Sequence, residues 1–188
     1  MLRMYQYRPA LRAAHCRNLG AIGDLKGFVR RLLREIWRRH VRSLRWHVSG
    51  DVFGVPYARA LLSVMTATPE VEHFLYTRSW RVARLRPWLE RMAELDNVAV
   101  WYSADATTGL PDSWPERVRV AWMALHAAEQ EPWACGEDIG RCDLVFLDQP
   151  LRRLGLRTFA GVRICPQEQT PGVTCSSCRF CLLGRAGE

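Results

Sequence analysis

The sequence predicts an α/β protein: a mainly parallel sheet with flanking helices, arranged as an incomplete (β/α) barrel, followed by a cysteine-rich C-terminal tail. Two observations support this fold class. Helical and extended patterns alternate along most of the chain, which is typical of right-handed β-α-β crossovers. The expected strands are short and apolar, as in parallel sheets that are covered on both faces. We expect a barrel domain over residues 1–164 and a metal-binding tail over residues 165–188 that packs on it.

Three helices are expected in the first half of the chain. Residues 23–44 form the first, with Asp24 as its N-cap. Residues 55–69 form the second, and residues 79–95 form the third, where Pro87 either starts or kinks the helix. The apolar positions of the first helix recur at helical spacing: Phe28, Leu32, Leu33, Ile36, Trp37 and Val41.

Six extended segments are expected between and after these helices. Each is a short run rich in apolar residues and bounded by turn-forming residues. A turn-rich loop is expected over residues 104–116, and an irregular loop or lid over residues 127–141. The expected strands cover residues 44–51, 71–77, 97–103, 117–123, 142–150 and 159–165.

The composition of the chain limits the classes of protein to which it can belong. The chain has 188 residues, of which 48% are hydrophobic and 24% are charged, so it has enough apolar material for one folded core. No apolar run is long enough to span a bilayer, and the N-terminus shows no secretory signal. We therefore expect a cytoplasmic protein without a membrane partner. Seven cysteines in that reducing compartment favour a metal site over a disulfide framework.

The chain is basic, with 27 Lys and Arg against 19 Asp and Glu and a net charge of +8. Arginines fill one face of the first expected helix between Arg30 and Arg42. Such a surface can attract nucleic acid or another polyanion. The alternative is a solvated basic face without a partner, and charge alone leaves both open.

Polar residues follow the expected strands at the ends where ligands bind in parallel α/β folds. Because the carboxyl ends of parallel strands meet at one edge of the sheet, we expect these polar residues to form one site there, called the mouth below, that holds a substrate or cofactor. Arg78 would bind an anionic group such as phosphate. The predicted mouth residues are His47, Ser49, Gly50, Asp51, Thr77, Arg78, Ser103 and Asp105.

Each mouth residue also has a purely structural interpretation. The run Ser49–Asp51 could be a turn that caps the next helix, and Asp105 could form an Asx-turn. Arg78 could be a surface arginine, and His47 a hydrogen-bonded core histidine. The common position of these residues at the strand ends favours one site over four independent coincidences.

Four cysteines lie in the tail, and three of them form a CxxCxxC run: Cys175, Cys178 and Cys181, with Cys165 ten residues upstream. Zinc is usually held by paired CxxC knuckles, whereas a cubane cluster takes three cysteines from CxxCxxC and one from elsewhere. A second CxxC pair is absent. The spacing therefore favours a 4Fe-4S iron–sulfur cluster and leaves zinc as the alternative metal.

The remaining cysteines carry less information. Cys135 and Cys142 flank a loop and are interpreted as ordinary thiols, although they could form a second ligand pair. Cys16 stands alone. Since Cys165 ends the last expected strand, a metal bound there would lie at the same mouth as Asp51 and Asp105.

Three blocks of the sequence resemble a known family. They read "RWHVSGDVFGVPYARALLSVMTATPEVEHFLYTRSWRV", "VWYSADATTGLP" and "ICPQEQTPGVTCSSCRFCL". In this order they resemble the "gene product 88" proteins of phages and mobile elements. The resemblance implies a strand-end pattern similar to the partial barrel of radical SAM proteins and a tail similar to an iron–sulfur ligand set. The CxxxCxxC run of radical SAM enzymes is missing near the start, where only Cys16 occurs.

These observations lead to one functional hypothesis with two alternatives. We expect an iron–sulfur metalloprotein of phage or mobile-element origin, with redox or radical SAM-like chemistry and an electron donor as partner. The first alternative is a zinc-stabilised, basic nucleic-acid-binding protein. The second is an interaction protein without chemistry that uses loop tryptophans, Trp114 and Trp133, as contact anchors.

Overall fold

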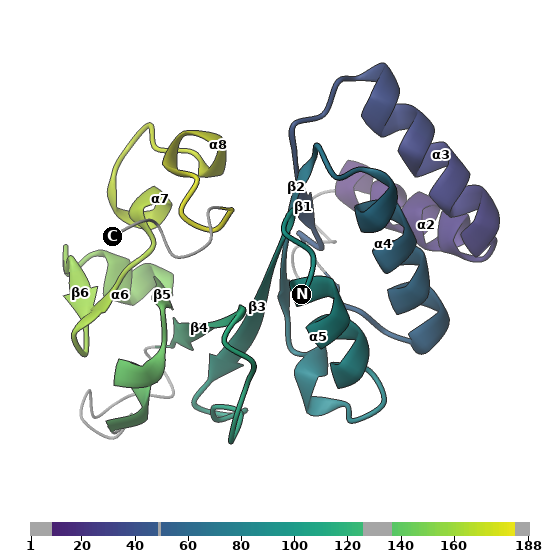
Figure 1. Ribbon diagram of the computed structural model, residues 1–188. Helices are drawn as coiled ribbons and strands as arrows, with labels where there is room; N and C mark the ends of the chain where they lie inside the picture. Colours follow the sequence, from purple (N-terminus) through teal and green to yellow (C-terminus); the bar gives the residue numbers. More distant parts are fainter. Residues whose placement is uncertain (1–8, 49, 126–136, 183–188) are drawn as a thin grey trace.

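A computed structural model describes residues 9–48, 50–125 and 137–182 of the chain (Figure 1). Its centre is a five-stranded sheet in which every neighbouring pair is parallel and the strand order follows the sequence. The sheet curls into a half-barrel, which confirms the predicted fold class. The strands are β1 (Ser43–Trp46), β2 (Glu72–Thr77), β3 (Val98–Asp105), β4 (Val118–Ala124) and β5 (Leu144–Leu147).

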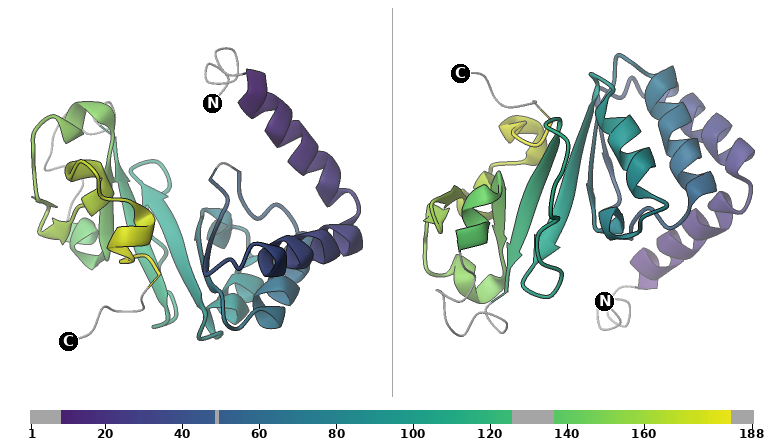
Figure 2. Two further views of the ribbon diagram at one scale, coloured as in Figure 1. Left: turned by 90° about the horizontal axis from the view of Figure 1, so that it is seen from above. Right: turned by 60° about the horizontal axis from the view of Figure 1, so that its bottom comes forward.

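Helices from the two halves of the chain lie on opposite sides of the sheet. Figures 1 and 2 show α3, α4 and α5 on one side and the short helices of the tail, α7 and α8, on the other. The helices are α2 (Pro9–Ile22), α3 (Leu25–Arg38), α4 (Val55–Ala67), α5 (Arg86–Ala93), α6 (Gln149–Arg152), α7 (Pro166–Gln169) and α8 (Cys175–Cys178), with 3-10 turns η1 (Ser79–Arg81) and η2 (Glu137–Arg141).

The strands alternate in the way that gives the sheet two apolar faces. Leu75, Val100 and Val120 point to the side of α3–α5 and join the larger core cluster. Their neighbours in sequence point to the opposite, inner side and join a second cluster. Because successive side chains of a strand face opposite sides, a fully apolar strand needs a cover on each face. The tail supplies the cover of the inner face.

The first predicted helix is confirmed at its start, including its cap, but it ends at residue 38 instead of 44, because residue 40 has a positive φ and residues 43–46 form β1. Asp24 accepts a hydrogen bond at 2.9 Å from the backbone N–H of Gly27, one of the free donors at the start of α3. Ile36 is buried, and Phe28 packs against the larger core. Trp37, however, is 53% exposed, so it does not belong to the buried stripe.

Two expected elements are divided in the structure. The segment predicted as one helix over residues 79–95 contains η1 and the shorter α5, because Pro87 lacks a backbone N–H and lies in the first turn of α5. The expected last strand is a hairpin of β6 (Thr158–Phe159) and β7 (Val162–Arg163), with Ala160 and Gly161 both at positive φ in the turn.

Helix α2 is absent from the sequence-based interpretation. It lacks an apolar stripe strong enough to reveal it, and most of its residues are exposed. It contacts mainly α3, so it adds little to the sheet core.

The turn between α4 and β2 depends on a single amide side chain. Asn97 Nδ2 is within 3.0–3.1 Å of the carbonyl oxygens of Met65, Thr68 and Val71. We expect Asn97→Ala to lower the free energy of unfolding by about 2 kcal/mol, since it removes one donor from each of these three carbonyls. Urea denaturation measures the change. A loss no larger than that of Asn18→Ala, on the exposed helix α2, would contradict this role.

Candidate functional site

The cysteine-rich tail begins where Cys165 leaves the sheet. Ile164 forms a parallel bridge with Val145 of β5, and the Cys165 backbone N–H donates to the Val145 carbonyl at 2.9 Å. This pairing points the buried Cys165 side chain to the inner face, where it packs with Trp101 and Leu144. The chain then turns through α7 and α8 and returns across the same face (Figure 1).

Cys181 is held directly above the middle strands. The Tyr76 hydroxyl of β2 donates a hydrogen bond to Cys181 Sγ at 2.8 Å. Tyr76 also packs edge-on against Phe146, with ring centroids 5.3 Å apart. The Cys181 sulfur therefore has a fixed position in an aromatic environment, although it is 105 residues from Tyr76 in sequence.

The backbone next to Cys181 is bound by β3 and β4. Trp101 Nε1 donates to the Cys181 carbonyl at 3.1 Å. Arg119 donates to the carbonyls of Phe180 and Cys181 at 3.1 and 3.3 Å, and its guanidinium stacks over the Trp101 ring at 4.1 Å. Since Trp101 and Arg119 are register partners on neighbouring strands, they form one surface that anchors the end of the tail.

The short helix α8 carries Cys175 and Cys178. Thr174 and Ser177 form a reciprocal capping box at its start, and Arg179 ends it in the left-handed conformation, with φ of 54°. Arg179 also forms an ion pair with Glu72 at the start of β2. Capping and ion pair together hold α8 over the inner face next to Cys181.

The four predicted ligands are electrostatic neighbours. Burial raises the pKa of Cys165 to about 11, with a further contribution from Cys181. Burial also raises the pKa of Cys181; Tyr76 and Arg119 oppose the rise, whereas Cys175 and Cys178 add to it. The charges of Cys175 and Cys178 thus act on Cys181, and that of Cys181 acts on Cys165.

The tail cysteines lie on the same side of the sheet, but in the described residues their side chains are not arranged as a metal-binding site. Within residues 9–48, 50–125 and 137–182, no group of three or more His, Cys, Asp or Glu side chains stands in an arrangement that could hold a metal ion. Cys165, Cys175 and Cys181 belong to one apolar cluster with Phe180. Of the other thiols, Cys16 is exposed on α2, Cys142 is buried, and Cys135 lies outside the described residues.

The predicted mouth residues form a hydrogen-bonded network at the strand ends. Asp51 accepts hydrogen bonds from its neighbour Val52 N–H at 2.6 Å, from the Thr77 hydroxyl, and from the Arg78 N–H at 2.7 Å. The ends of β1 and β2 are thereby joined. Asp51 therefore has a structural role, but it does not cap the next helix as its structural interpretation proposed: Gly54 is the N-cap of α4.

Asp105 closes the same network at the end of β3. It accepts from the Thr107 and Thr108 backbone N–H groups and from the Thr107 hydroxyl, which is the Asx-turn arrangement. Its other oxygen pairs with Arg78 at 2.6 Å. Burial opposes the charged form, but the threonine hydrogen bonds and Arg78 outweigh it and lower the pKa of Asp105.

The other mouth residues have separate environments. His47 Nε2 is 2.9 Å from the Tyr57 hydroxyl, and burial lowers the pKa of His47. Gly50 has a φ of 94°, which favours glycine at this turn. The Ser103 carbonyl accepts from Trp80 Nε1 at 3.1 Å. Ser49 lies outside the described residues.

The mouth and the cysteines form two groups. Among the described residues, no hydrogen bond or ion pair joins Asp51, Arg78 or Asp105 to a cysteine of the tail. The sequence interpretation identified both groups but missed Tyr76, Trp101 and Arg119, which hold the tail. The sequence did contain a signal for these three residues. Side chains alternate between the two faces along β2, β3 and β4, and this alternation places all three on the face opposite the helices.

The arginines of α3 are only partly free. Arg38 and Arg39 both pair with Glu35, at 2.7 and 2.8 Å, and Arg31 donates to the Ala21 carbonyl. Trp114 packs against the larger core rather than projecting as an anchor, while Trp133 lies outside the described residues. None of the described helices is both long and apolar enough to cross a bilayer.

Comparison with known proteins gives one match. No curated protein and no solved structure matches this chain. The resemblance to radical SAM barrels therefore has no support from a matching relative. Residues 3–184 match the family described as "Gene product 88". Because the match covers nearly the whole chain, the protein belongs to the gene product 88 family.

Proposed function

We propose that this protein is an iron–sulfur metalloprotein whose cluster is bound on the inner face of the half-barrel by Cys165, Cys175, Cys178 and Cys181. The observation that carries the proposal is the return of the tail to Cys165. A hydrogen-bonded anchor fixes Cys181, and Cys165 leaves a strand edge on the same face. Two segments that the sequence separates thus bring four sulfurs to one side of the sheet.

Metal binding at these sulfurs would require the deprotonation of two buried thiols. Burial raises the pKa of Cys165 and Cys181, so both would remain protonated at neutral pH without a cation. A bound metal stabilises thiolates, since its positive charge offsets the loss of solvation. Arg119 adds positive charge close to Cys181. Binding requires the sulfurs of Cys175 and Cys178 to turn toward Cys165 and Cys181.

A cluster in this position would support electron transfer. When bound, it supplies a redox centre, and the chain supplies the aromatic side chains of Tyr76, Trp101 and Phe180 that limit water around it. Exposure to solvent and hydrogen bonds to the sulfurs tune such potentials, and Tyr76 is the donor to Cys181. Radical SAM-like chemistry is a narrower version of this proposal and would require a cluster position left open for the cofactor.

The test is metal analysis and an absorption spectrum on anaerobically purified protein. We expect brown protein with about four iron atoms and four sulfides per chain. Cys178→Ser should lose the visible absorption, because Cys178 belongs to the proposed ligand set. The matched control, Cys16→Ser, alters an exposed thiol on α2 and should retain it.

Two outcomes would reject the iron–sulfur proposal. Colourless protein with one zinc per chain would favour the alternative, a zinc-stabilised protein that binds nucleic acid through exposed arginines of α3 such as Arg30 and Arg34. Protein without any bound metal, or equal iron in Cys178→Ser and wild type, would remove the cysteine site altogether.

A further inference from the structure

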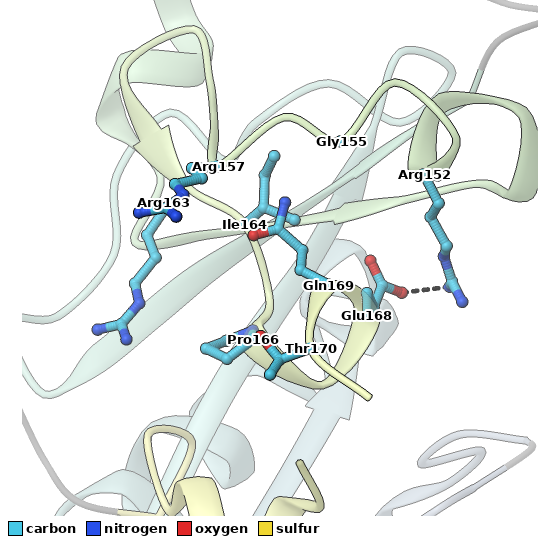
Figure 3. Close-up of a pocket in the computed structure, with 9 residues that line it drawn as sticks. All are labelled: Arg152, Gly155, Arg157, Arg163, Ile164, Pro166, Glu168, Gln169 and Thr170. Atoms are coloured by element: carbon cyan, nitrogen blue, oxygen red, sulfur yellow. Dashed lines mark hydrogen bonds and ion pairs between the residues drawn. The ribbon is translucent and has the colours of Figure 1, made fainter. Parts of the chain in front are cut away.

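A pocket of about 550 Å3 lies at the far edge of the half-barrel, next to β5. Its walls come from the segment after α6, from β7 and from α7, and it contains none of the cysteines (Figure 3). This volume is in the range of small-molecule sites. The lining residues are Arg152, Gly155, Arg157, Arg163, Ile164, Pro166, Glu168, Gln169 and Thr170.

The one acidic residue of the pocket is already neutralised. Glu168 Oε2 accepts from the Leu147 backbone N–H at 2.7 Å, and Oε1 pairs with Arg152. The Glu168 side chain is only 6% exposed. The Glu168 carboxylate therefore holds α7 against β5 and pairs with Arg152. The dashed line in Figure 3 marks the ion pair with Arg152.

Two arginines on the opposite wall of the pocket have no acidic partner among the described residues. Figure 3 places Arg157 and Arg163 together, across the pocket from Arg152 and Glu168. No carboxylate pairs with either arginine in the described ranges of the chain. The Arg163 guanidinium stacks over Phe180 at 4.9 Å, which holds it at the rim. Three arginines and one glutamate line the pocket, so its net charge is +2.

Neutral donors complete the lining. The Gln169 amide and the Thr170 hydroxyl line the pocket between the two charged walls. Ile164 and Pro166 offer apolar surface beside them. An arginine fork, an amide and a hydroxyl are the donors that bind a phosphate group, and a phosphate monoester carries a charge of about −1.5 to −2 that matches the unbalanced arginines.

We infer that this pocket binds a small molecule with a phosphate monoester group, recognised by Arg157 and Arg163. The organic part of the ligand would lie on Ile164 and Pro166. A nucleic acid fits less well, because a pocket of about 550 Å3 suits a small molecule better than a continuous chain of nucleotides. The inference is independent of the metal proposal, since no cysteine lines the pocket.

The experiment is calorimetric titration of the full chain with glucose 6-phosphate at low ionic strength. We expect Arg157→Gln to weaken binding at least tenfold, because it removes one charge-assisted contact. The Arg157 side chain is exposed and makes no hydrogen bond or ion pair within the described residues, so the variant should fold normally. The matched control is Arg153→Gln, which removes an exposed arginine beside α6 that does not line the pocket.

Glucose and gluconate test whether the pocket recognises the phosphate group. Glucose should not bind, and gluconate should bind more weakly than glucose 6-phosphate, because it carries a single negative charge. Failure of the wild type to bind glucose 6-phosphate, or equal losses in Arg157→Gln and Arg153→Gln, would overturn the inference. Binding of a single-stranded oligonucleotide through Arg157, without binding of glucose 6-phosphate, would replace the small molecule by nucleic acid.

Discussion

Arg119→Met is expected to lower the free energy of unfolding by about 3 kcal/mol and to release the end of the tail. Arg119 is 7% exposed and donates to the carbonyls of Phe180 and Cys181. Hydrogen bonds from a charged donor contribute roughly 1.5 kcal/mol or more each. Methionine keeps much of the volume of the side chain but removes both donors. The loss should therefore come from the tail contacts rather than from a cavity.

Urea denaturation measures the loss of stability, and hydrogen exchange measures the release of the tail. The backbone amides of residues 179–182 should exchange faster in Arg119→Met, because the tail opens without unfolding of the sheet. The matched control is Arg117→Met, at the residue directly before β4. Arg117 pairs with Asp96 at the surface, where the two side chains are 54% and 96% exposed, so its loss should cost less than about 1 kcal/mol. Equal effects of the two variants would show that Arg119 does not anchor the tail.

Acid is expected to destabilise the fold through His73. This histidine is buried between β1 and α4, where Trp46 Nε1 donates to Nδ1 at 3.2 Å and Nε2 is 2.9 Å from the Thr68 hydroxyl. That hydroxyl donates to the Val64 carbonyl, so it accepts from the Nε2 proton. The arrangement requires neutral imidazole. Protonation of Nδ1 would remove the hydrogen bond from Trp46.

The direction of the pH dependence follows from the lowered pKa. Burial lowers the pKa of His73 from 6.5 to about 4. Between these values the unfolded chain takes up a proton that the folded chain does not, so stability falls as the pH is lowered through this window. A shift of this size corresponds to about 3 kcal/mol at pH 4 relative to neutral pH.

Urea denaturation between pH 4 and pH 7.5 tests this contribution. His73→Asn retains an acceptor for Trp46 but cannot titrate, so its stability should depend less on pH than that of the wild type. His40→Asn replaces an exposed histidine at a φ of 50°, which asparagine tolerates, and should leave the dependence unchanged. NMR titration of the His73 ring gives the pKa directly, even where a variant folds poorly. A ring pKa near 6.5 would contradict the prediction.

Local sequence patterns were sufficient for much of the fold. The Asp24 cap and the helical spacing after it predicted the start of the first helix, because they act between near neighbours in the chain. The alternation of helices and short apolar strands predicted the parallel sheet, because a helix between two strands returns the chain in the same direction. The CxxCxxC run predicts a metal site from its spacing alone, and this remains a prediction. Four of the predicted mouth residues share one hydrogen-bonded network, and their hydrogen bonds join the strand ends: Asp51, Thr77, Arg78 and Asp105.

The surface on which the tail rests was decided by tertiary structure. Tyr76, Trp101 and Arg119 come from three strands, and only the parallel register places them side by side opposite Cys181. The pocket of Arg157 and Arg163 also depends on the β6–β7 hairpin, which the sequence pattern merged into one strand. Sequence determined which residues could form helices and strands, whereas the contacts that anchor the tail on the sheet join residues far apart in the chain, and no local pattern encodes such pairings.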